Sequence, residues 1–213
     1  CKGITVYRDG SRSGVLISES KKKEENENAI IEHHAPKRPK VLEAKVIRFQ
    51  NNEEKWIAVV GILNGKPYEI FTGSAEDSFH LPKWVETGWV IKNKKEKDKS
   101  RYDFQYADKD GYKITFEGLS RAFNKEYWNY ARLISAVIRH GMPMPYIVEM
   151  VSTLNLHTES LNTWKNGVAR ALKKFIPSGT KPVNNFCSEC GEAALVYEEG
   201  CLNCKNCGNT KCN

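Results

Sequence analysis

Residues 187–213, at the C-terminal end of the sequence, read CSECGEAALVYEEGCLNCKNCGNTKCN. This stretch contains six of the seven cysteines of the chain: Cys187, Cys190, Cys201, Cys204, Cys207 and Cys212. Two pairs have the spacing Cys-x-x-Cys and are followed at once by glycine, at Gly191 and Gly208. Such a turn points two thiolates at one centre, and the glycine takes the positive φ that closes the turn.

The two turns together predict a zinc ribbon. Residues 191–203 separate them, which is enough chain for a short hairpin, and residues 194–197 (Ala-Leu-Val-Tyr) supply its apolar strand. Four thiolates form the closed tetrahedral site of a structural zinc, so we expect zinc to be bound by Cys187, Cys190, Cys204 and Cys207. The alternative is a disulfide framework, which requires an oxidising compartment.

Two cysteines remain once zinc takes four. Cys201 and Cys212 flank the second turn, and Cys212 is the penultimate residue. A thiol near a terminus is poorly held for packing or for metal binding, but it is free to exchange a disulfide with a partner. Two alternatives stay open: both thiols are spare, or zinc ligation slides to Cys201 or Cys212.

Composition narrows the function classes. The chain has 213 residues, 40% of them hydrophobic, and a formal net charge of +7, which suits one medium domain with an appendage. The ribbon does not share this charge, because residues 183–213 carry net −2 from Glu189, Glu192, Glu198 and Glu199 against Lys205 and Lys211. This balance argues against a ribbon that grips phosphates. We find no apolar run of about 18 residues and no leader, and therefore expect a cytoplasmic protein without a membrane segment.

The N-terminal part has two regions. Residues 1–14 contain a short β-branched run, Ile4-Thr-Val-Tyr7, typical of a strand buried on both faces of a parallel sheet. A single strand is not stable alone, so its partners must lie elsewhere. Residues 15–39 are rich in Lys, Glu and Asn and end in prolines, as in a linker.

Residues 40–180 predict an α+β domain in which an antiparallel sheet is covered by about three helices. Alternating apolar residues predict strands over 41–50, 55–63, 67–73, 84–92, 102–107 and 112–118, with a tight hairpin turn at Asn64-Gly65. Helical spacing predicts helices over 124–140, from Pro143 to 154, and from an N-cap at Thr158 to about 176. We find no glycine-rich phosphate loop, metalloprotease motif or serine nucleophile elbow.

Three stretches make the chain resemble the C-terminal part of a class II, adenosylcobalamin-dependent ribonucleotide reductase. Residues 1–12 (CKGITVYRDGSR) resemble the last strand of that family's ten-stranded α/β barrel. Residues 65–71 (GKPYEIF), with 131–135 and 139–141, resemble the accessory domain that follows the barrel, although the cysteine-bearing signature of some relatives is absent. Residues 198–212 resemble the family's tail. The resemblance implies a chain divided into a barrel strand (1–14), a linker (15–39), an accessory domain (40–180) and a zinc-ribbon redox tail (181–213).

The family reduces ribonucleotides to deoxyribonucleotides. The resemblance implies that adenosylcobalamin generates a thiyl radical on a barrel cysteine and that two barrel thiols become a disulfide. A cysteine pair on the tail re-reduces this disulfide, and thioredoxin or a glutaredoxin-like protein recharges the tail. The pair implied here is Cys201 and Cys212, with Cys207 as the rival partner of Cys212. The same resemblance implies that the chain is part of a ribonucleoside-diphosphate reductase with the cobalamin site in the upstream barrel, and it leaves a triphosphate substrate open as the alternative.

Other readings remain at this stage. The chain by itself lacks the residues for radical generation, so we expect it to act with an upstream barrel, through which a homodimer can also form. Cys1 is compatible with an intein junction, with a separately encoded half or with a truncation. The competing functions are a basic zinc-ribbon module that binds nucleic acid and a purely structural interaction domain, but we expect no specific nucleic-acid partner.

Overall fold

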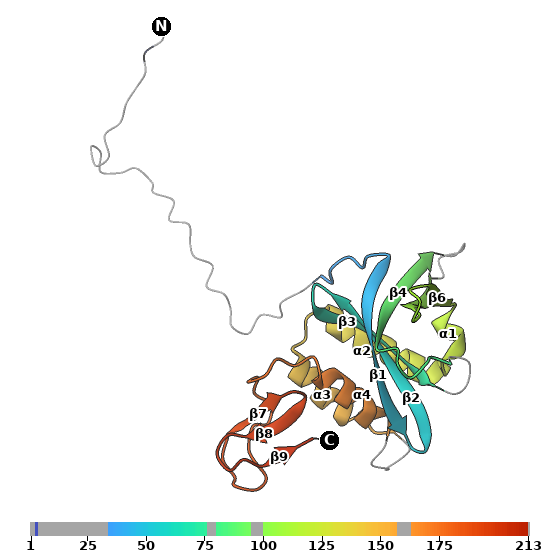
Figure 1. The fold of residues 1–213 in the computed structure, drawn as a ribbon. Coiled ribbons are helices and arrows are strands. Elements are labelled where there is room, and N and C mark those ends of the chain that lie inside the picture. The colour runs from blue at the N-terminus through green and yellow to red at the C-terminus, as the bar shows by residue number, and fades with distance from the viewer. Residues whose placement is uncertain (1–2, 4–33, 76–79, 95–99, 157–162, 213) are drawn as a thin grey trace. The chain divides into compact units, whose positions relative to one another are not determined.

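Six antiparallel strands form the main sheet of the computed structural model, which describes residues 3, 34–75, 80–94, 100–156 and 163–212 (Figure 1). Their order across the sheet is β3-β2-β1-β4-β5-β6. The strands are β1 (Val41–Asn51), β2 (Glu54–Leu63), β3 (Lys66–Ser74), β4 (Thr87–Lys94), β5 (Ser100–Ala107) and β6 (Lys113–Phe116). The predicted antiparallel sheet is thereby confirmed, whereas the predicted barrel strand and most of the linker lie outside the described residues.

The hairpin between β2 and β3 forms where the sequence predicts it. Asn64 and Gly65 both have positive φ, 51° and 76°, as a two-residue turn of this hand requires. The turn places Leu63 opposite Lys66 and Ile62 opposite Pro67, and the register then shifts at an irregularity between Gly61 and Ile62. Local turn chemistry therefore fixes the pairing next to the turn.

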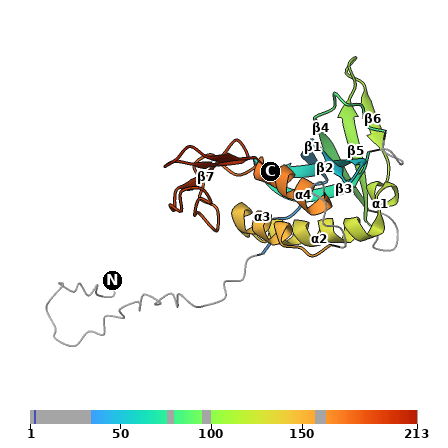
Figure 2. The same cartoon turned by 90° about the horizontal axis from the view of Figure 1, so that it is seen from below.

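Strand β2 of the main sheet is buried on both faces. Trp56, Ala58 and Val60 of β2 belong to one hydrophobic core, while the alternate residues Ile57 and Val59 belong to the other. The first core is covered by α2 (Lys125–Arg139), α3 (Met144–Ser152) and α4 (Trp164–Lys173), which Figure 2 shows on one side of β1–β3. Two apolar faces explain why β2 reads as a nearly continuous apolar run.

Four helices are present in the described residues, where the sequence predicted about three. The additional one is α1 (Leu119–Ala122), a single turn that follows Gly118 with φ of 73°. The helix predicted over 124–140 is α2, with Asn124 as its N-cap, whereas the hydroxyl of Thr163 caps α4 by accepting from the Asn166 N–H. The predicted cap at Thr158 lies outside the described residues.

The main sheet is strongly curled. Four strand spacings separate β3 from β5, which in a flat sheet amounts to about 19 Å. The rings of Phe71 on β3 and Tyr102 on β5 nevertheless lie 5.2 Å apart between centroids. Trp128 of α2 packs against both rings, at 5.4 Å from Phe71 and 6.3 Å from Tyr102. The curl thus encloses the second core and brings distant strands to α2.

Helix α2 also covers the edge strand β3. The Ser135 hydroxyl accepts a hydrogen bond from the Ile70 N–H at 2.9 Å and lies 3.2 Å from the Ile70 carbonyl oxygen. One side chain therefore serves backbone groups that an edge strand otherwise leaves exposed.

A second, three-stranded sheet ends the chain. Its strands β7 (Leu195–Glu198), β8 (Cys201–Cys204) and β9 (Thr210–Lys211) are antiparallel and pair in this order. The described residues from His34 to Cys212 belong to one compact unit that includes both sheets. None of the helices in the described ranges combines the length and apolarity needed to cross a bilayer.

Candidate metal centre and cysteine pair

The two Cys-x-x-Cys-Gly turns have matching geometry. In the first, the Gly191 N–H donates to the Cys187 carbonyl at 2.9 Å, and in the second the Gly208 N–H donates to the Cys204 carbonyl at 3.0 Å. Both glycines have φ of 74°. This conformation is accessible to glycine at little cost, which explains the residue after each cysteine pair.

The turns bring four thiol groups to one centre. The sulfur atoms of Cys187, Cys190, Cys204 and Cys207 all lie within 4.8 Å of one another. The Sγ atoms of Cys187 and Cys207 are 3.7 Å apart, as are those of Cys190 and Cys204. A tetrahedron with zinc–sulfur bonds of about 2.3 Å has sulfur–sulfur edges of about 3.8 Å. The donor set and its spacing thus fit a tetrahedral thiolate-binding metal ion.

The electrostatics of the cluster favour a bound cation. Hydrogen bonds from the backbone N–H groups of Cys190 and Glu189 lower the pKa of Cys187 to about 6. The pKa of Cys190 is also lowered, first by the Glu192 N–H and then by the Asn206 amide. These donors stabilise thiolates, the form that binds metal.

Cys207 behaves differently from its neighbours. The Asn209 N–H acts to lower its pKa, but burial and the thiols of Cys204, Cys190 and Cys187 together raise that pKa to about 12. Four thiolates in contact repel one another, so the last one resists ionisation without a cation. A divalent metal ion supplies the missing positive charge.

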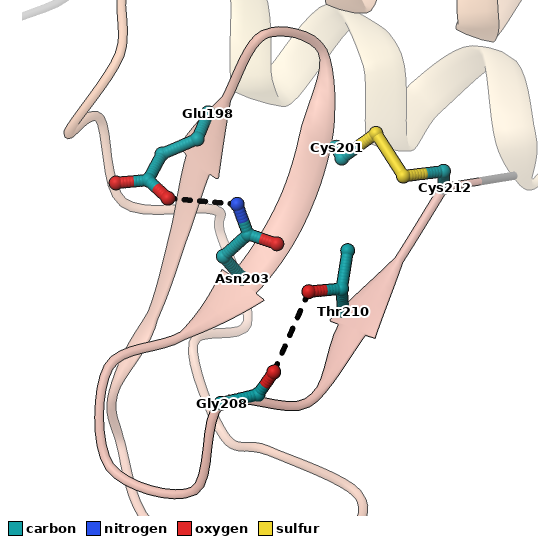
Figure 3. Close-up of a disulfide and its surroundings, with 6 residues drawn as sticks. All are labelled: Glu198, Cys201, Asn203, Gly208, Thr210 and Cys212. Atoms are coloured by element: carbon teal, nitrogen blue, oxygen red, sulfur yellow. Dashed lines mark hydrogen bonds between the residues drawn. A yellow bond between two sulfur atoms is a disulfide. The ribbon is translucent and has the colours of Figure 1, made fainter.

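Cys201 and Cys212 meet at the other end of the ribbon. Strands β8 and β9 pair Leu202 with Lys211, and one step further along this register Cys201 faces Cys212. The two residues form a disulfide with Cα atoms 4.5 Å apart, the separation of a non-hydrogen-bonded pair in an antiparallel ladder. Figure 3 shows the bond joining the ends of the two strands. Cys212 is exposed and Cys201 is half-buried.

The four-cysteine cluster and the disulfide are separated along β8, which begins at Cys201 and ends at Cys204. Three residues of extended chain span about 10 Å. The rival partner Cys207 lies with the cluster of four, and the disulfide leaves Cys187, Cys190, Cys204 and Cys207 as free thiols. The sequence grouping of four cysteines and two is therefore also a spatial grouping.

Tyr197 anchors the ribbon on the main domain, a role that the sequence did not reveal. Its side chain is only 4% exposed and belongs to the core beneath α3 and α4. Its backbone N–H donates to Thr180 and its carbonyl accepts from Gly179, each at 2.8 Å. The β7–β8 turn reaches α4, since a Cβ added to Gly200 would lie 3.6 Å from the Lys174 nitrogen. The sequence offered one signal for this role, which is the presence of a large aromatic residue in a very short strand.

Polar side chains brace the ribbon on its exposed side. The carboxylate of Glu198 accepts from the Asn203 amide at 2.7 Å and pairs with the Lys205 ammonium group. Figure 3 shows the first of these bonds across the hairpin. They link β7 to β8 and to the second cysteine turn.

Comparison with known proteins adds a family to this geometry. The family model described as NrdJ homologue C-terminal domain matches residues 42–177, which span both the six-stranded sheet and its four helices. No curated protein and no solved structure matches the chain. NrdJ is the class II, adenosylcobalamin-dependent ribonucleotide reductase, so this chain belongs to the family of NrdJ homologue C-terminal domains, as its sequence resemblance implied.

Proposed function

We propose that this chain is the C-terminal part of an adenosylcobalamin-dependent ribonucleotide reductase, with a zinc ribbon whose remaining cysteine pair recharges the active site. Residues 1–14 would complete the catalytic barrel, 15–39 link it to the accessory domain (40–180), and 181–213 form the redox tail. The observation that carries this proposal is the division of six cysteines into a tetrahedral cluster and a separate pair. A zinc site holds the ribbon in shape while the pair remains available for exchange.

Zinc is the metal that best suits four thiolates in a structural site. The backbone N–H groups directed at Cys187 and Cys190 support this assignment because they stabilise the thiolate form. When bound, zinc supplies folding free energy to a sheet with few apolar residues of its own. We propose Cys187, Cys190, Cys204 and Cys207 as its ligands.

The tail pair acts by two thiol–disulfide exchanges. The Cys212 thiolate, being exposed, attacks one sulfur of the barrel disulfide, forms a mixed disulfide and releases the first barrel thiol after protonation. Cys201 then attacks the Cys212 sulfur, which releases the second barrel thiol and leaves a Cys201–Cys212 disulfide. Two electrons and two protons have passed from the tail to the barrel.

A dithiol reductant restores the tail. Thioredoxin or a glutaredoxin-like protein reduces the Cys201–Cys212 disulfide and becomes oxidised in turn. Adenosylcobalamin, bound by the upstream barrel, supplies the radical chemistry of ribose reduction. The barrel is therefore the principal partner of this chain, and a homodimer formed through it is compatible with the proposal.

The test is turnover in a complex of the chain with its catalytic barrel. Cys212→Ser should retain zinc, block repeated turnover driven by thioredoxin and allow one turnover from a prereduced barrel. A small dithiol that reaches the barrel directly should restore repeated turnover. Unchanged thioredoxin-driven turnover in this variant would refute the role of Cys212.

Cys207→Ser separates the two pairings. If Cys207 is a zinc ligand, this variant loses zinc. If Cys207 is instead the exchange partner of Cys212, the Cys207→Ser variant keeps zinc and fails in repeated turnover, while the Cys201→Ser variant remains active. The second pattern would reassign the pair.

A further inference from the structure

A cavity of about 590 Å³ lies in the seam of the curled sheet, between β3, β5, α1 and α2. It belongs to the accessory domain, and none of the six C-terminal cysteines lines it. Four arginines and three aromatic residues lie in its wall: Arg101, Arg121, Arg132, Arg139, Phe71, Tyr102 and Trp128. The volume falls within the range of small-molecule sites, about 300–1,000 Å³.

Helix α2 presents one continuous face to this cavity. Trp128, Arg132, Ser135 and Arg139 follow one another at intervals of four, three and four residues, which places them on one side of a helix, and all four line the cavity. Ser135 at the middle of this face is fixed by its contact with the edge strand β3. The arginines are thus carried by a helix of 15 residues with a defined position.

The described carboxylates beside the cavity pair with Arg38 and Arg101, and Glu117 shares Arg101 with Asp103 at 2.8 Å. Glu69 pairs with Arg38 at 2.6 Å, with both side chains almost fully buried. Asp103 is bonded by Arg101 at 2.9 Å and by the Asn93 amide at 2.6 Å. Acidic groups close to the cavity therefore do not use up its remaining cations.

Three arginines are left with unpaired charge. Within the described part of the chain, Arg121, Arg132 and Arg139 take part in no ion pair. Arg121 and Arg132 are exposed, while the Arg139 guanidinium donates to the Ser135 carbonyl and lies 5.8 Å from the Tyr68 ring centroid. Guanidinium groups bind phosphate oxygens through pairs of N–H donors.

Aromatic side chains line the same cavity as these cations. Phe71, Tyr102 and Trp128 pack on one another and all three line the cavity. Aromatic side chains of this kind offer a surface on which a nucleobase stacks. Cations beside an aromatic wall are a combination suited to a ligand with a polyanionic end and a planar end.

We propose that this cavity binds a nucleoside triphosphate. Arg121, Arg132 and Arg139 hold the phosphates, and the base packs against the wall formed by Tyr102 and Trp128. The site is independent of the ribbon and of its cysteines. It gives the accessory domain a ligand of its own.

The test is isothermal titration of the full chain with ATP, GTP, CTP and UTP at 0.15 M salt, beside inorganic triphosphate, adenosine and an oligothymidylate. At least one nucleoside triphosphate should bind more tightly than triphosphate or adenosine alone. Arg132→Ala and Arg121→Ala should each weaken this binding about tenfold, as expected for a lost charge-assisted contact. Neither residue makes an ion pair in the described chain, so thermal unfolding should be unchanged.

Arg170→Ala is the matched control, because it removes the same charge from α4, away from this cavity. It should leave nucleotide affinity within about twofold, as expected for a distant surface charge screened by salt. The proposal fails if none of the four nucleotides binds, if triphosphate alone binds as tightly, or if Arg170→Ala weakens binding as much as Arg132→Ala. Tighter binding of the oligothymidylate than of any nucleotide would also overturn it, in favour of a surface for single-stranded nucleic acid.

Discussion

Replacement of Cys187 by serine should affect the whole accessory domain as well as the ribbon. The variant loses one of four thiolates, and we expect it to lose zinc and the folding free energy that the ion supplies. The ribbon then unfolds and withdraws Tyr197 from the core in which it is 4% exposed. The main sheet and helices retain the rest of their two cores, so they should remain folded but less stable.

The size of this loss follows from the buried ring. A buried aromatic side chain covers about 150–250 Å², which at about 25 cal/mol per Å² is worth about 4–6 kcal/mol as an upper bound. Truncations of buried aromatic residues cost about 3–5 kcal/mol. With about 3 kcal/mol lost and a shift of about 2–4 °C per kcal/mol in a domain of this size, Tm should fall by about 6–12 °C.

The measurement combines metal content with thermal unfolding in reducing buffer. Trp56 and Trp164 lie in the same core as Tyr197 and report its unfolding by fluorescence. The matched control is the double variant Cys201→Ser, Cys212→Ser, which should keep one zinc per chain and the wild-type Tm because the reductant removes the disulfide from both proteins. Full zinc in Cys187→Ser would refute the ligand assignment, and zinc loss without a change in Tm would refute the anchoring role of Tyr197.

Three further predictions concern the fold. Ser135→Ala leaves the buried Ile70 N–H without its partner and should lower the free energy of unfolding in urea by about 1–3 kcal/mol. The control Ser152→Ala removes a hydroxyl bonded to the Val148 carbonyl and should lower it less. Equal losses in the two variants would contradict the role of Ser135 in covering the edge strand. Gly167→Ala should lower the free energy of unfolding by about 1–3 kcal/mol although alanine has the better helix propensity, because the new Cβ would lie 2.0 Å from Phe49 Cδ2. A more stable variant would disprove this contact. Burial, with a smaller contribution from Glu149, raises the pKa of Tyr197 above its ordinary 10.0, so its stabilisation is complete below pH 10 and is lost as pH rises through the folded-state pKa. Tyr197→Phe should therefore be less sensitive to alkali than the wild type, and identical alkaline profiles would argue against this origin.

Features that arise within a few residues of one another could be predicted from the sequence. Alternation of apolar side chains predicted the six strands, Asn64-Gly65 predicted a hairpin and helical spacing predicted α2 to within a residue at each end. Cysteine spacing likewise grouped the members of each Cys-x-x-Cys-Gly turn. These signals are local because backbone conformation and side-chain direction repeat with the period of the element.

Sequence reasoning missed α1 and the observed start of α4, where residues of a second element are involved. The turn that forms α1 has only four residues and no helical repeat to detect, and its N-terminus is set by the Gly118 N–H donating to Asp103 of β5 at 2.7 Å. Thr163, the observed cap of α4, precedes Trp164, whose indole N–H donates to Thr72 of β3 at 3.0 Å. Both boundaries depend on partners far along the chain.

Contacts between residues that are distant in the sequence follow from tertiary packing and could not be predicted from local patterns. The curl that joins Phe71, Tyr102 and Trp128 depends on how two cores fill the faces of one sheet, and this also creates the arginine-lined cavity. The burial of Tyr197 depends on its packing in the core that α2, α3 and α4 cover. The contact between Cys201 and Cys212 depends on the register of β8 and β9, which the resemblance implied but spacing alone left open. In each case the same local pattern allows many arrangements, and close packing selects one of them. The reason is that the hydrophobic free energy is proportional to the apolar area buried, and this area is buried only when surfaces remote in sequence fit together.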